Sequence, residues 1–98
     1  MDEPYTHTTW HVRPEQQEAF VDRWRAWVQW SHREGFRARA TLLRDVEHPQ
    51  TFISFGPWET LDAVRNWRAL PGYHDRVRSL LEVVESWEPR TLERVAEA

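Results

Sequence analysis

The sequence predicts an α+β domain with the ferredoxin-like order β-α-β-β-α-β and a four-stranded antiparallel sheet that carries its helices on one face. Residues 42–73 give the first reason, because they read as a strand, a turn, a strand and an amphipathic helix in direct succession. Residues 14–34 give the second, because they form a longer amphipathic segment after a strand-like amino end. A hairpin that runs straight into a helix is half of a split βαβ unit, so one face of the sheet should remain uncovered.

The first strand is expected at residues 5–12, which are rich in threonine and aromatic residues with a period of two. Pro14 is expected at or near the first position of the following helix, with Glu15 in its first turn, because both residue types suit a helix amino end. This helix should run to about Glu34 and stop at Gly35. Its apolar stripe is formed by Phe20, Trp24, Trp27, Val28 and Ser31.

The second strand is expected at residues 37–46, and both of its faces should be covered because its alternating positions are apolar or small. Residues 45–49 should form the turn of the hairpin, since aspartate favours local hydrogen bonds to the backbone and proline cannot pair in a central strand. The third strand is expected at residues 51–55, with Gly56-Pro57 as its end.

A second helical region should open at residues 58–60. Its core side is expected to carry Leu61, Val64 and Trp67. The Leu-Pro-Gly run at residues 70–72 should break this helix, which then resumes over residues 73–85. Residues 86–95 should form the fourth strand and complete the ferredoxin-like order.

Length and composition narrow the class of protein. The chain of 98 residues predicts one domain, spanning 1–98, in a cytoplasmic protein. Cysteine is absent, which excludes a disulfide framework, a thiol nucleophile and a thiolate metal site. No apolar run approaches the ~18 residues of a membrane span, and the polar amino end does not resemble a signal peptide. The net charge is −3 and the arginines are scattered among 16 carboxylates, which argues against nucleic-acid binding.

Seven tryptophans are the outlier of the composition. A domain of this size can bury only some of these rings in its own core, so the others should line a pocket or a subunit interface. The alternative is that most of them are simply core. The uncovered sheet face, with its threonine, aromatic and aliphatic residues, predicts a homodimer that packs sheet to sheet about a two-fold axis.

Several short motifs are similar to those of a known family over nearly the whole chain, residues 6–95. They are Trp10-His11-Val12-Arg13-Pro14-Glu15 before Phe20, Leu42-Leu43-Arg44-Asp45 with Pro49, Phe52, Phe55, Trp58-Glu59, Ala63 and Pro71-Gly72-Tyr73. In these the chain resembles the antibiotic-biosynthesis monooxygenase family of small dimeric α/β-barrel proteins. The resemblance implies the barrel fold and a dimer, whereas chemistry varies across the superfamily from quinone-forming oxygenases to haem-degrading enzymes.

The best-defined reaction that the resemblance implies is the cofactor-independent oxidation of anthrone-type polyketides to quinones. Trp58 matches the family's tryptophan at the exit of the third strand. Where the family has an asparagine, a tyrosine and a histidine, this chain has Ser54, Val64 and Leu42. The family's arginine on the last helix falls near Arg76 or Arg78.

The resulting hypothesis is a small monooxygenase that oxidises a planar, polyketide- or hydroquinone-like aromatic without a cofactor or a metal. Such a site needs a large apolar cleft, a polar group that orients the substrate, and exclusion of bulk water. The candidate catalytic residues are Trp58, His74 and Arg78. The candidate substrate-binding residues are Trp10, Trp30, Ser54, Trp67 and Tyr73. In this hypothesis Ser54 or His74 orients a substrate oxygen, and Arg78 stabilises a developing oxyanion.

Two alternatives remain open. The first is a non-catalytic dimeric barrel that binds a hydrophobic ligand, which the absence of a strong base at the matched positions favours. The second is a haem-degrading oxygenase, because Trp67 matches the tryptophan of that branch of the superfamily. Thr8 and Val77 stand where that branch has an asparagine and a histidine, although His74 lies nearby.

Overall fold

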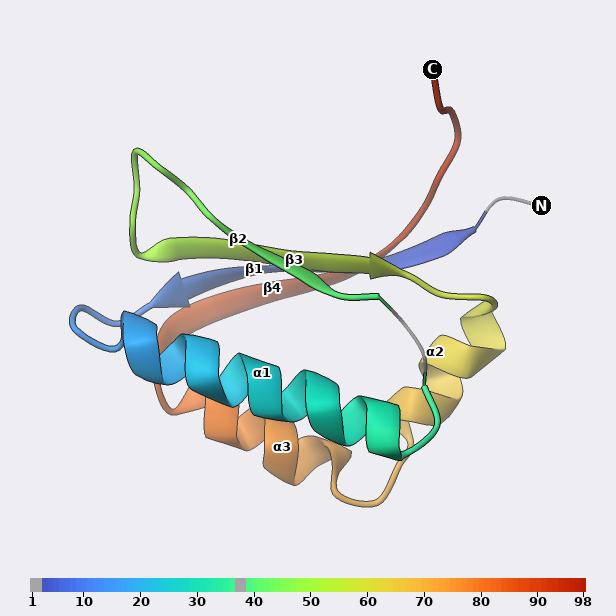
Figure 1. The fold of residues 1–98 in the computed structure, drawn as a ribbon, viewed down its shortest axis with the longest axis horizontal. Coiled ribbons are helices and arrows are strands. Elements are labelled where there is room, and N and C mark those ends of the chain that lie inside the picture. The colour runs from blue at the N-terminus through green and yellow to red at the C-terminus, as the bar shows by residue number, and fades with distance from the viewer. Residues whose placement is uncertain (1–2, 37–38) are drawn as a thin grey trace.

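A computed structural model of the chain describes residues 3–36 and 39–98, which form four strands and three helices. In chain order these are β1 (Pro4–Val12), α1 (Gln17–Arg33), β2 (Thr41–Arg44), β3 (Thr51–Pro57), α2 (Leu61–Arg68), α3 (Tyr73–Leu81) and β4 (Val84–Glu93). The strands make one antiparallel sheet in the order β2-β3-β1-β4, and the three helices lie on one side of it (Figure 1). The predicted ferredoxin-like arrangement is confirmed.

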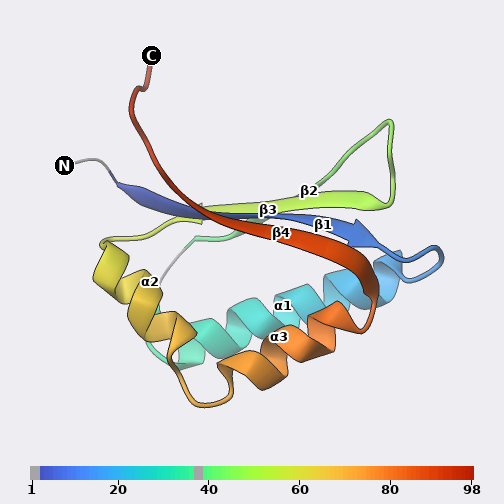
Figure 2. The same cartoon turned by 180° about the vertical axis from the view of Figure 1, so that it is seen from behind.

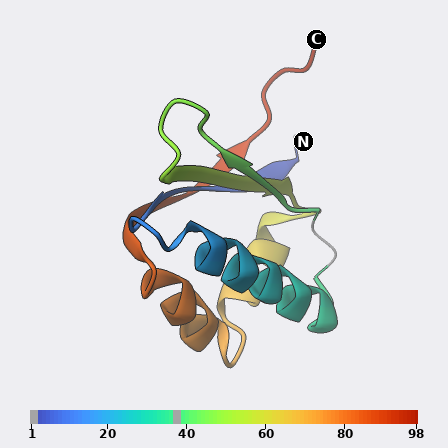
Figure 3. The same cartoon turned by 60° about the vertical axis from the view of Figure 1, so that its left-hand side comes forward.

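The helices form a single layer beneath the sheet. Figure 2, seen from behind, shows that no helix of the described residues covers the other face of the sheet. Helices α1 and α3 run side by side, whereas α2 lies towards one end of the layer (Figure 3). None of the helices in the described part of the chain is both long and apolar enough to cross a membrane.

Helix α1 begins at Gln17 and is preceded by a turn. Pro14 and Glu15 lie in this turn, so the prediction that they open the helix is wrong. The physical reason is the φ angle of Glu15, which is 67° and belongs to a left-handed backbone that a right-handed helix does not contain. The other end is as predicted, because Gly35 has a φ of 98° and its N–H donates to the His32 carbonyl at 3.0 Å.

Strand β2 is shorter than predicted and lies at the edge of the sheet. Within one copy of the chain the prediction that both its faces are covered is wrong, because an edge strand lies at the margin of the core and three of the four residues of β2 are exposed. Residues 37 and 38, which the prediction included, lie outside the described residues. The predicted turn is present, and the carboxylate of Asp45 accepts the backbone N–H groups of Glu47 and His48 at 2.9 and 3.1 Å.

Strand β3 continues through Gly56 and Pro57, so the prediction that this pair ends the strand is wrong. Both residues pair with β1, Gly56 with Thr6 and Pro57 with Tyr5. Glycine suits position 56 because of a close approach and not because of a turn: a Cβ built there would overlap the carbonyl oxygen of Arg39. The backbone that leads into β2 therefore crosses directly against this end of β3.

Helix α2 begins at Leu61, later than predicted, and Thr60 is its N-cap. The Thr60 hydroxyl accepts a backbone N–H of the first turn at 3.0 Å. Trp58 therefore precedes the helix and does not open it. Val64 and Trp67 are buried as expected, whereas Leu61 is 42% exposed and lies outside the apolar stripe.

The predicted break in the second helical region is confirmed at Gly72, whose φ is 92°. Helix α3 starts at the next residue and ends at Leu81, earlier than predicted. The helix is therefore about one turn shorter than predicted, and strand β4 correspondingly begins at Val84, before the predicted residue 86.

The core lies between the sheet and the helical layer. Its fully buried large side chains are Trp10, Phe20, Leu80, Val12 and Val64. Six of the seven tryptophans are buried and Trp87 is half-buried. Most of these rings are therefore core, which is the alternative that the sequence left open to a pocket or subunit interface. Several of the same rings also bound a cleft at one end of the core.

Candidate functional site

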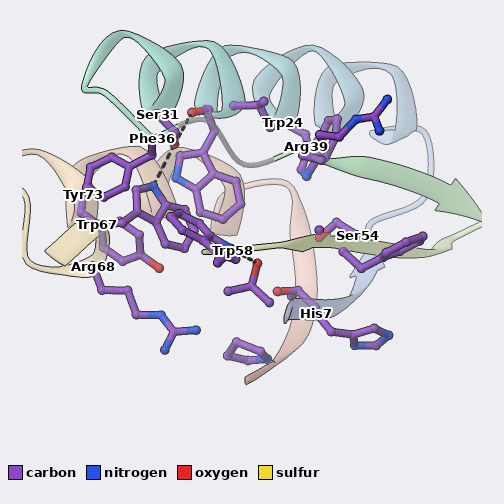
Figure 4. Close-up of a pocket in the computed structure, with 18 of the residues that line it drawn as sticks. His7, Trp24, Ser31, Phe36, Arg39, Ser54, Trp58, Trp67, Arg68 and Tyr73 are labelled. Carbon is purple, nitrogen blue, oxygen red and sulfur yellow. Dashed lines mark hydrogen bonds between the residues drawn. The ribbon is translucent and has the colours of Figure 1, made fainter. Parts of the chain in front are cut away.

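A cleft opens where β1 and β3 face the carboxyl-terminal half of α1 and the end of α2 (Figure 4). Its cavity measures about 60 Å³, which is room for a few water molecules. Its aromatic side includes Trp24, Trp27, Phe36, Trp58, Trp67, Tyr73 and Trp87. Hydroxyl groups reach it from Thr6, Thr8, Ser31 and Ser54. The cleft is therefore apolar with a few polar groups, the usual character of a small-molecule site.

Trp67 stands at the centre of the aromatic wall of this cleft. Its ring centroid lies 4.9 Å from that of Trp58 and 5.2 Å from that of Trp27. Tyr73 meets the same ring edge-on, with the centroids 5.0 Å apart, and Phe36 extends the wall at 5.7 Å from Trp58. Because tilted and edge-on pairs are the favoured arrangements of aromatic rings, the wall is held by its own packing.

Hydrogen bonds fix two of these indole rings in place. Trp58 Nε1 donates to Thr6 Oγ1 at 2.9 Å, which ties the end of β3 to β1. Trp67 Nε1 donates to Ser31 Oγ at 2.8 Å, and the Ser31 hydroxyl in turn donates to the Trp27 carbonyl at 2.9 Å. A buried N–H without a partner is costly, so each bond strongly favours the observed ring orientation.

Trp27 differs from its neighbours because its Nε1 is buried without a hydrogen-bond partner among the described residues. The residue is only 8% exposed and lines the cleft. Buried N–H groups in proteins are almost always paired, with protein atoms or with water. This indole therefore offers a donor to an acceptor atom that the described chain does not supply.

The ionisable groups of the cleft are predominantly basic. Arg39, Arg68 and His32 contribute to the lining, whereas the ring of His7 points away from the cleft, and none of the described lining residues is an aspartate or a glutamate. Burial raises the pKa of the Tyr73 phenol, and the nearby Arg68 guanidinium opposes part of that rise. Tyr73 is therefore a neutral hydrogen-bond donor at neutral pH.

Metal-ligating side chains do not gather at this site. Within residues 3–36 and 39–98, no group of three or more histidine, cysteine, aspartate or glutamate side chains is arranged to hold a metal ion. The groups that line the cleft are aromatic faces, hydroxyls and two guanidinium groups, and the Trp27 indole N–H is enclosed in its wall.

Comparison with known proteins places this cleft in a family context. The family model for antibiotic biosynthesis monooxygenases (ABM) matches residues 5–79, which include most of the residues of the cleft. The chain belongs to the ABM family. A search of curated proteins found no match to the sequence.

Solved structures share the whole ABM fold of this chain. SnoaB, a cofactor-independent oxygenase from Streptomyces nogalater, has a TM-score of 0.88 at 20% identity, over 99% of this chain and 97% of SnoaB. A protein from Bordetella bronchiseptica has a TM-score of 0.82 at 16% identity, over 98% of this chain and 100% of that one. A protein from Pseudomonas aeruginosa has a TM-score of 0.77 at 18% identity, over 98% and 97%. At these identities the likeness establishes the fold and not the reaction.

Four of the predicted site residues line the cleft of this ABM protein: Trp58, Ser54, Trp67 and Tyr73. They come from β3 and the residue after it, from α2 and from the start of α3, and Figure 4 shows how these elements bring them together. Trp10 does not line the cleft but supports it. It is fully buried, and its Nε1 donates to Ser54 Oγ at 2.9 Å.

His74 and Arg78 are not brought into the cleft, contrary to the hypothesis drawn from the sequence. Both are exposed on α3, because Val77 and Leu80 are the buried residues of that helix and His74 and Arg78 lie on its other side. Arg78 donates to Asp75 at 3.3 Å, as a surface ion pair. The haem-degrading alternative requires His74 in the cleft that Trp67 lines, and the structure places this histidine outside that cleft.

Trp30 is the third predicted residue that lies elsewhere. It is buried on α1, and the Arg76 guanidinium stands 5.6 Å from the centroid of its ring. A Cβ built on Gly72 would lie 3.7 Å from the Trp30 ring, which places this tryptophan against the start of α3. Trp30 therefore packs helix against helix, outside the lining of the cleft.

Other residues of the cleft were not identified from the sequence: Thr6, Trp27, Ser31, Phe36, Arg39 and Arg68. Trp27 and Ser31 belong to the predicted apolar stripe of α1, and a search for polar residues within that stripe would have found Ser31. Arg39 and Arg68 carry no local signal. They reach the cleft only because the chain crosses the end of β3 and because α2 ends beside Tyr73.

Proposed function

We propose that the protein is a monooxygenase that oxidises a planar, polyketide- or hydroquinone-like aromatic with dioxygen and without a cofactor. The observation that carries this proposal is the aromatic wall formed by Trp58 and Trp67 at 4.9 Å, in a cleft with polar groups at its edge. Trp58 occupies the position at which the resemblance to the family places a tryptophan. Membership of the ABM family supports the reaction class.

In this proposal the substrate itself supplies the electrons. A methylene carbon beside a phenol ring loses a proton, and the resulting carbanion, held flat against the indole faces, gives its electrons to dioxygen. A carbon–oxygen bond forms, the oxygen–oxygen bond breaks, and the second oxygen leaves as water, so that the methylene becomes a carbonyl. The chain contributes by orientation, by exclusion of water, and by donors to the developing oxyanion.

Tyr73 and Arg68 are the donors that we assign to that oxyanion. Both line the cleft, and they lie within hydrogen-bonding reach of each other. Tyr73 also packs edge-on against Trp67, so its hydroxyl is presented from a fixed ring. A neutral phenol and a guanidinium at one edge of an apolar cleft are suited to stabilising negative charge as it forms on a substrate oxygen.

The cleft must widen before a fused-ring substrate can enter. A cavity of about 60 Å³ is well below the ~300 Å³ at which small-molecule sites begin. A neighbouring hollow of about 500 Å³ shares Phe36, Arg39 and Trp58 with the cleft. Phe36 is half-buried and packs on Trp58, so displacement of its ring would join the two spaces. We propose Phe36 as the residue that moves on substrate entry.

Dioxygen uptake by the purified protein, with anthrone as a neutral member of the substrate class, tests the proposal. We expect uptake above the spontaneous rate and a loss of about tenfold or more in Trp58→Phe and Tyr73→Phe, since each removes a group that acts in the transition state. The control is His74→Ala, which should keep the wild-type rate because His74 is exposed outside the cleft.

The same experiment separates the two functions that the sequence left open. If anthrone quenches tryptophan fluorescence but no uptake occurs, the protein is a ligand-binding barrel and the proposed reaction is wrong. If uptake is unchanged in both cleft variants but falls in His74→Ala, the reaction takes place elsewhere and the cleft is not its site.

We also propose that two copies pair through the bare face of the sheet. Leu43 and Leu92 are 51% and 43% exposed there, and the Nδ1 atom of His7 is buried without a partner among the described residues. Light scattering after size exclusion should give the mass of a dimer. Leu43→Glu should shift the protein to a monomer, whereas the control Val46→Glu, in the exposed turn, should not. A monomeric wild-type protein at micromolar concentration would contradict the dimer.

A further inference from the structure

We propose that the cleft prefers an aromatic substrate that carries a carboxylate on its ring system, and that Arg68 binds this carboxylate. The inference rests on the proposed function in one respect, namely that the cleft is the substrate site. It goes further in naming a charged substituent and the residue that recognises it. The guanidinium of Arg68 has five N–H donors, so it can bind the carboxylate and still donate to the developing oxyanion.

The first argument is the charge of the lining. The chain has 16 acidic residues and a net charge of −3, yet none of the described residues that line the cleft is acidic. Arg39 and Arg68 both contribute to the lining. An apolar cleft with basic groups alone concentrates a positive potential, because the low-dielectric walls focus the field. Its charge therefore complements an anion.

The second argument is the state of Arg68 itself. Arg65 on α2 and Arg78 on α3 are exposed and pair with Asp62 and Asp75, at 3.1 and 3.3 Å. Arg68 is half-buried, and no carboxylate of the described residues pairs with it. The Tyr73 hydroxyl beside it is neutral and does not balance its charge, so this guanidinium has the capacity to bind an anion from outside the chain.

The position of Arg68 fits a group attached to a ring and not an isolated ion. Figure 4 shows its guanidinium next to the tryptophan wall formed by Trp58 and Trp67. A ring stacked on that wall places a substituent within reach of the guanidinium, and the planar fork of arginine matches the two oxygens of a carboxylate. Arg39 is exposed on the other side of the wall, so it adds to the potential without sharing the same oxygen atoms.

The third argument comes from Trp27, on the wall of the same cleft. Its buried Nε1–H has no acceptor among the described residues. This N–H is enclosed, so a ligand reaches it only once the cleft has widened, and a ligand rich in acceptor oxygens would then satisfy a donor that the chain leaves unpaired. This observation is independent of the arginines and points to the same kind of ligand.

Calorimetric titration of the full-length protein with 2-naphthoate and 2-naphthamide tests the preference directly, because the two probes differ in charge and share their ring system. We expect naphthoate to bind about tenfold more tightly at pH 7, a difference of about 1.4 kcal/mol. Arg68→Gln should abolish this preference, and Arg68→Lys should keep part of it because the charge remains. The matched control is Arg65→Gln, which removes the same charge from the exposed side of the same helix and should keep the preference.

Four outcomes would overturn the inference. Equal affinity for the two probes in the wild-type protein would refute the preference for an anion and leave the proposed oxidation of neutral anthrone standing. Acetate that displaces naphthoate at equal concentration would show a general anion site without any contribution from the ring. A preference that survives Arg68→Gln, in a variant with a wild-type circular dichroism spectrum, would assign the anion to another residue. Binding of neither probe, together with no uptake of dioxygen with anthrone, would remove the proposed function as well.

Discussion

Ser31 is the polar residue on which the aromatic wall depends most directly, and Ser31→Ala is therefore the sharpest test of how the cleft is held. Its hydroxyl accepts from Trp67 Nε1 at 2.8 Å and donates to the Trp27 carbonyl at 2.9 Å. Ser31 is 8% exposed and Trp67 is 6% exposed, so both partners of this hydrogen bond are buried. The substitution leaves a buried indole N–H unpaired.

The expected cost of Ser31→Ala is about 1–3 kcal/mol in the free energy of unfolding, the desolvation penalty of one orphaned donor. For a domain of this size each kcal/mol lowers the melting temperature by about 4–8 °C. Urea denaturation measures the free energy, and the control is Ser79→Ala on α3, where the carbonyl and not the hydroxyl accepts from Arg23.

A double-mutant cycle with Trp67→Phe shows whether the hydrogen bond is the cause. Phenylalanine has no N–H to orphan, so Ser31→Ala should cost much less in the Trp67→Phe background, with a coupling energy of about 0.5–3 kcal/mol. Equal costs in both backgrounds, or a cost in the wild-type background no larger than that of Ser79→Ala, would refute the reasoning.

Other substitutions test other parts of the structure. Gly56→Ala should destabilise by about 1–3 kcal/mol in urea denaturation, because its Cβ overlaps the Arg39 carbonyl; a neutral effect would show that this crossing is loose. Trp10→Ala should cost about 3–5 kcal/mol, since Trp10 is fully buried, whereas exposed His74→Ala should stay within about 0.5 kcal/mol. The pKa of Tyr73 is raised in the folded protein. Its contribution to stability is fully present at pH values below the ordinary tyrosine pKa of about 10, and it is lost as the pH rises through the folded pKa. Tyr73→Phe should therefore lack that part of the alkaline decline in the unfolding free energy, and an identical decline in both proteins would contradict the assignment.

The order of the elements was predictable because each depends on local patterning. The helical spacing of Phe20, Trp24 and Trp27 defines α1, and the turn at Asp45 defines the hairpin. The ends of elements were less predictable. The sequence at Gly56 predicts the end of a strand, but a strand tolerates glycine where another backbone crosses it. That crossing is a tertiary contact, so local sequence patterning does not reveal it.

The cleft was predictable where its residues follow from strand or helix periodicity, and not where they follow from packing. Trp58, Trp67 and Ser54 were identified because they sit on core-facing positions or match the family's motifs. His74 was assigned to the cleft from its closeness to Trp67 in the sequence, but a break at Gly72 resets the phase of the helix and turns this histidine outward. Arg68 was missed because a charged residue at the end of a helix is ordinarily solvated.

The central position of β1 also governs how the chain can assemble. Within this sheet β1 is synthesised first and its partner β4 last, with Pro4 pairing with Glu93. During synthesis β1 therefore carries an unpaired edge until β4 has emerged, which favours slow folding and leaves that edge open to other nascent chains. Charged and polar residues along β1, such as His7 and His11, lessen this risk of misassembly without weakening the finished sheet.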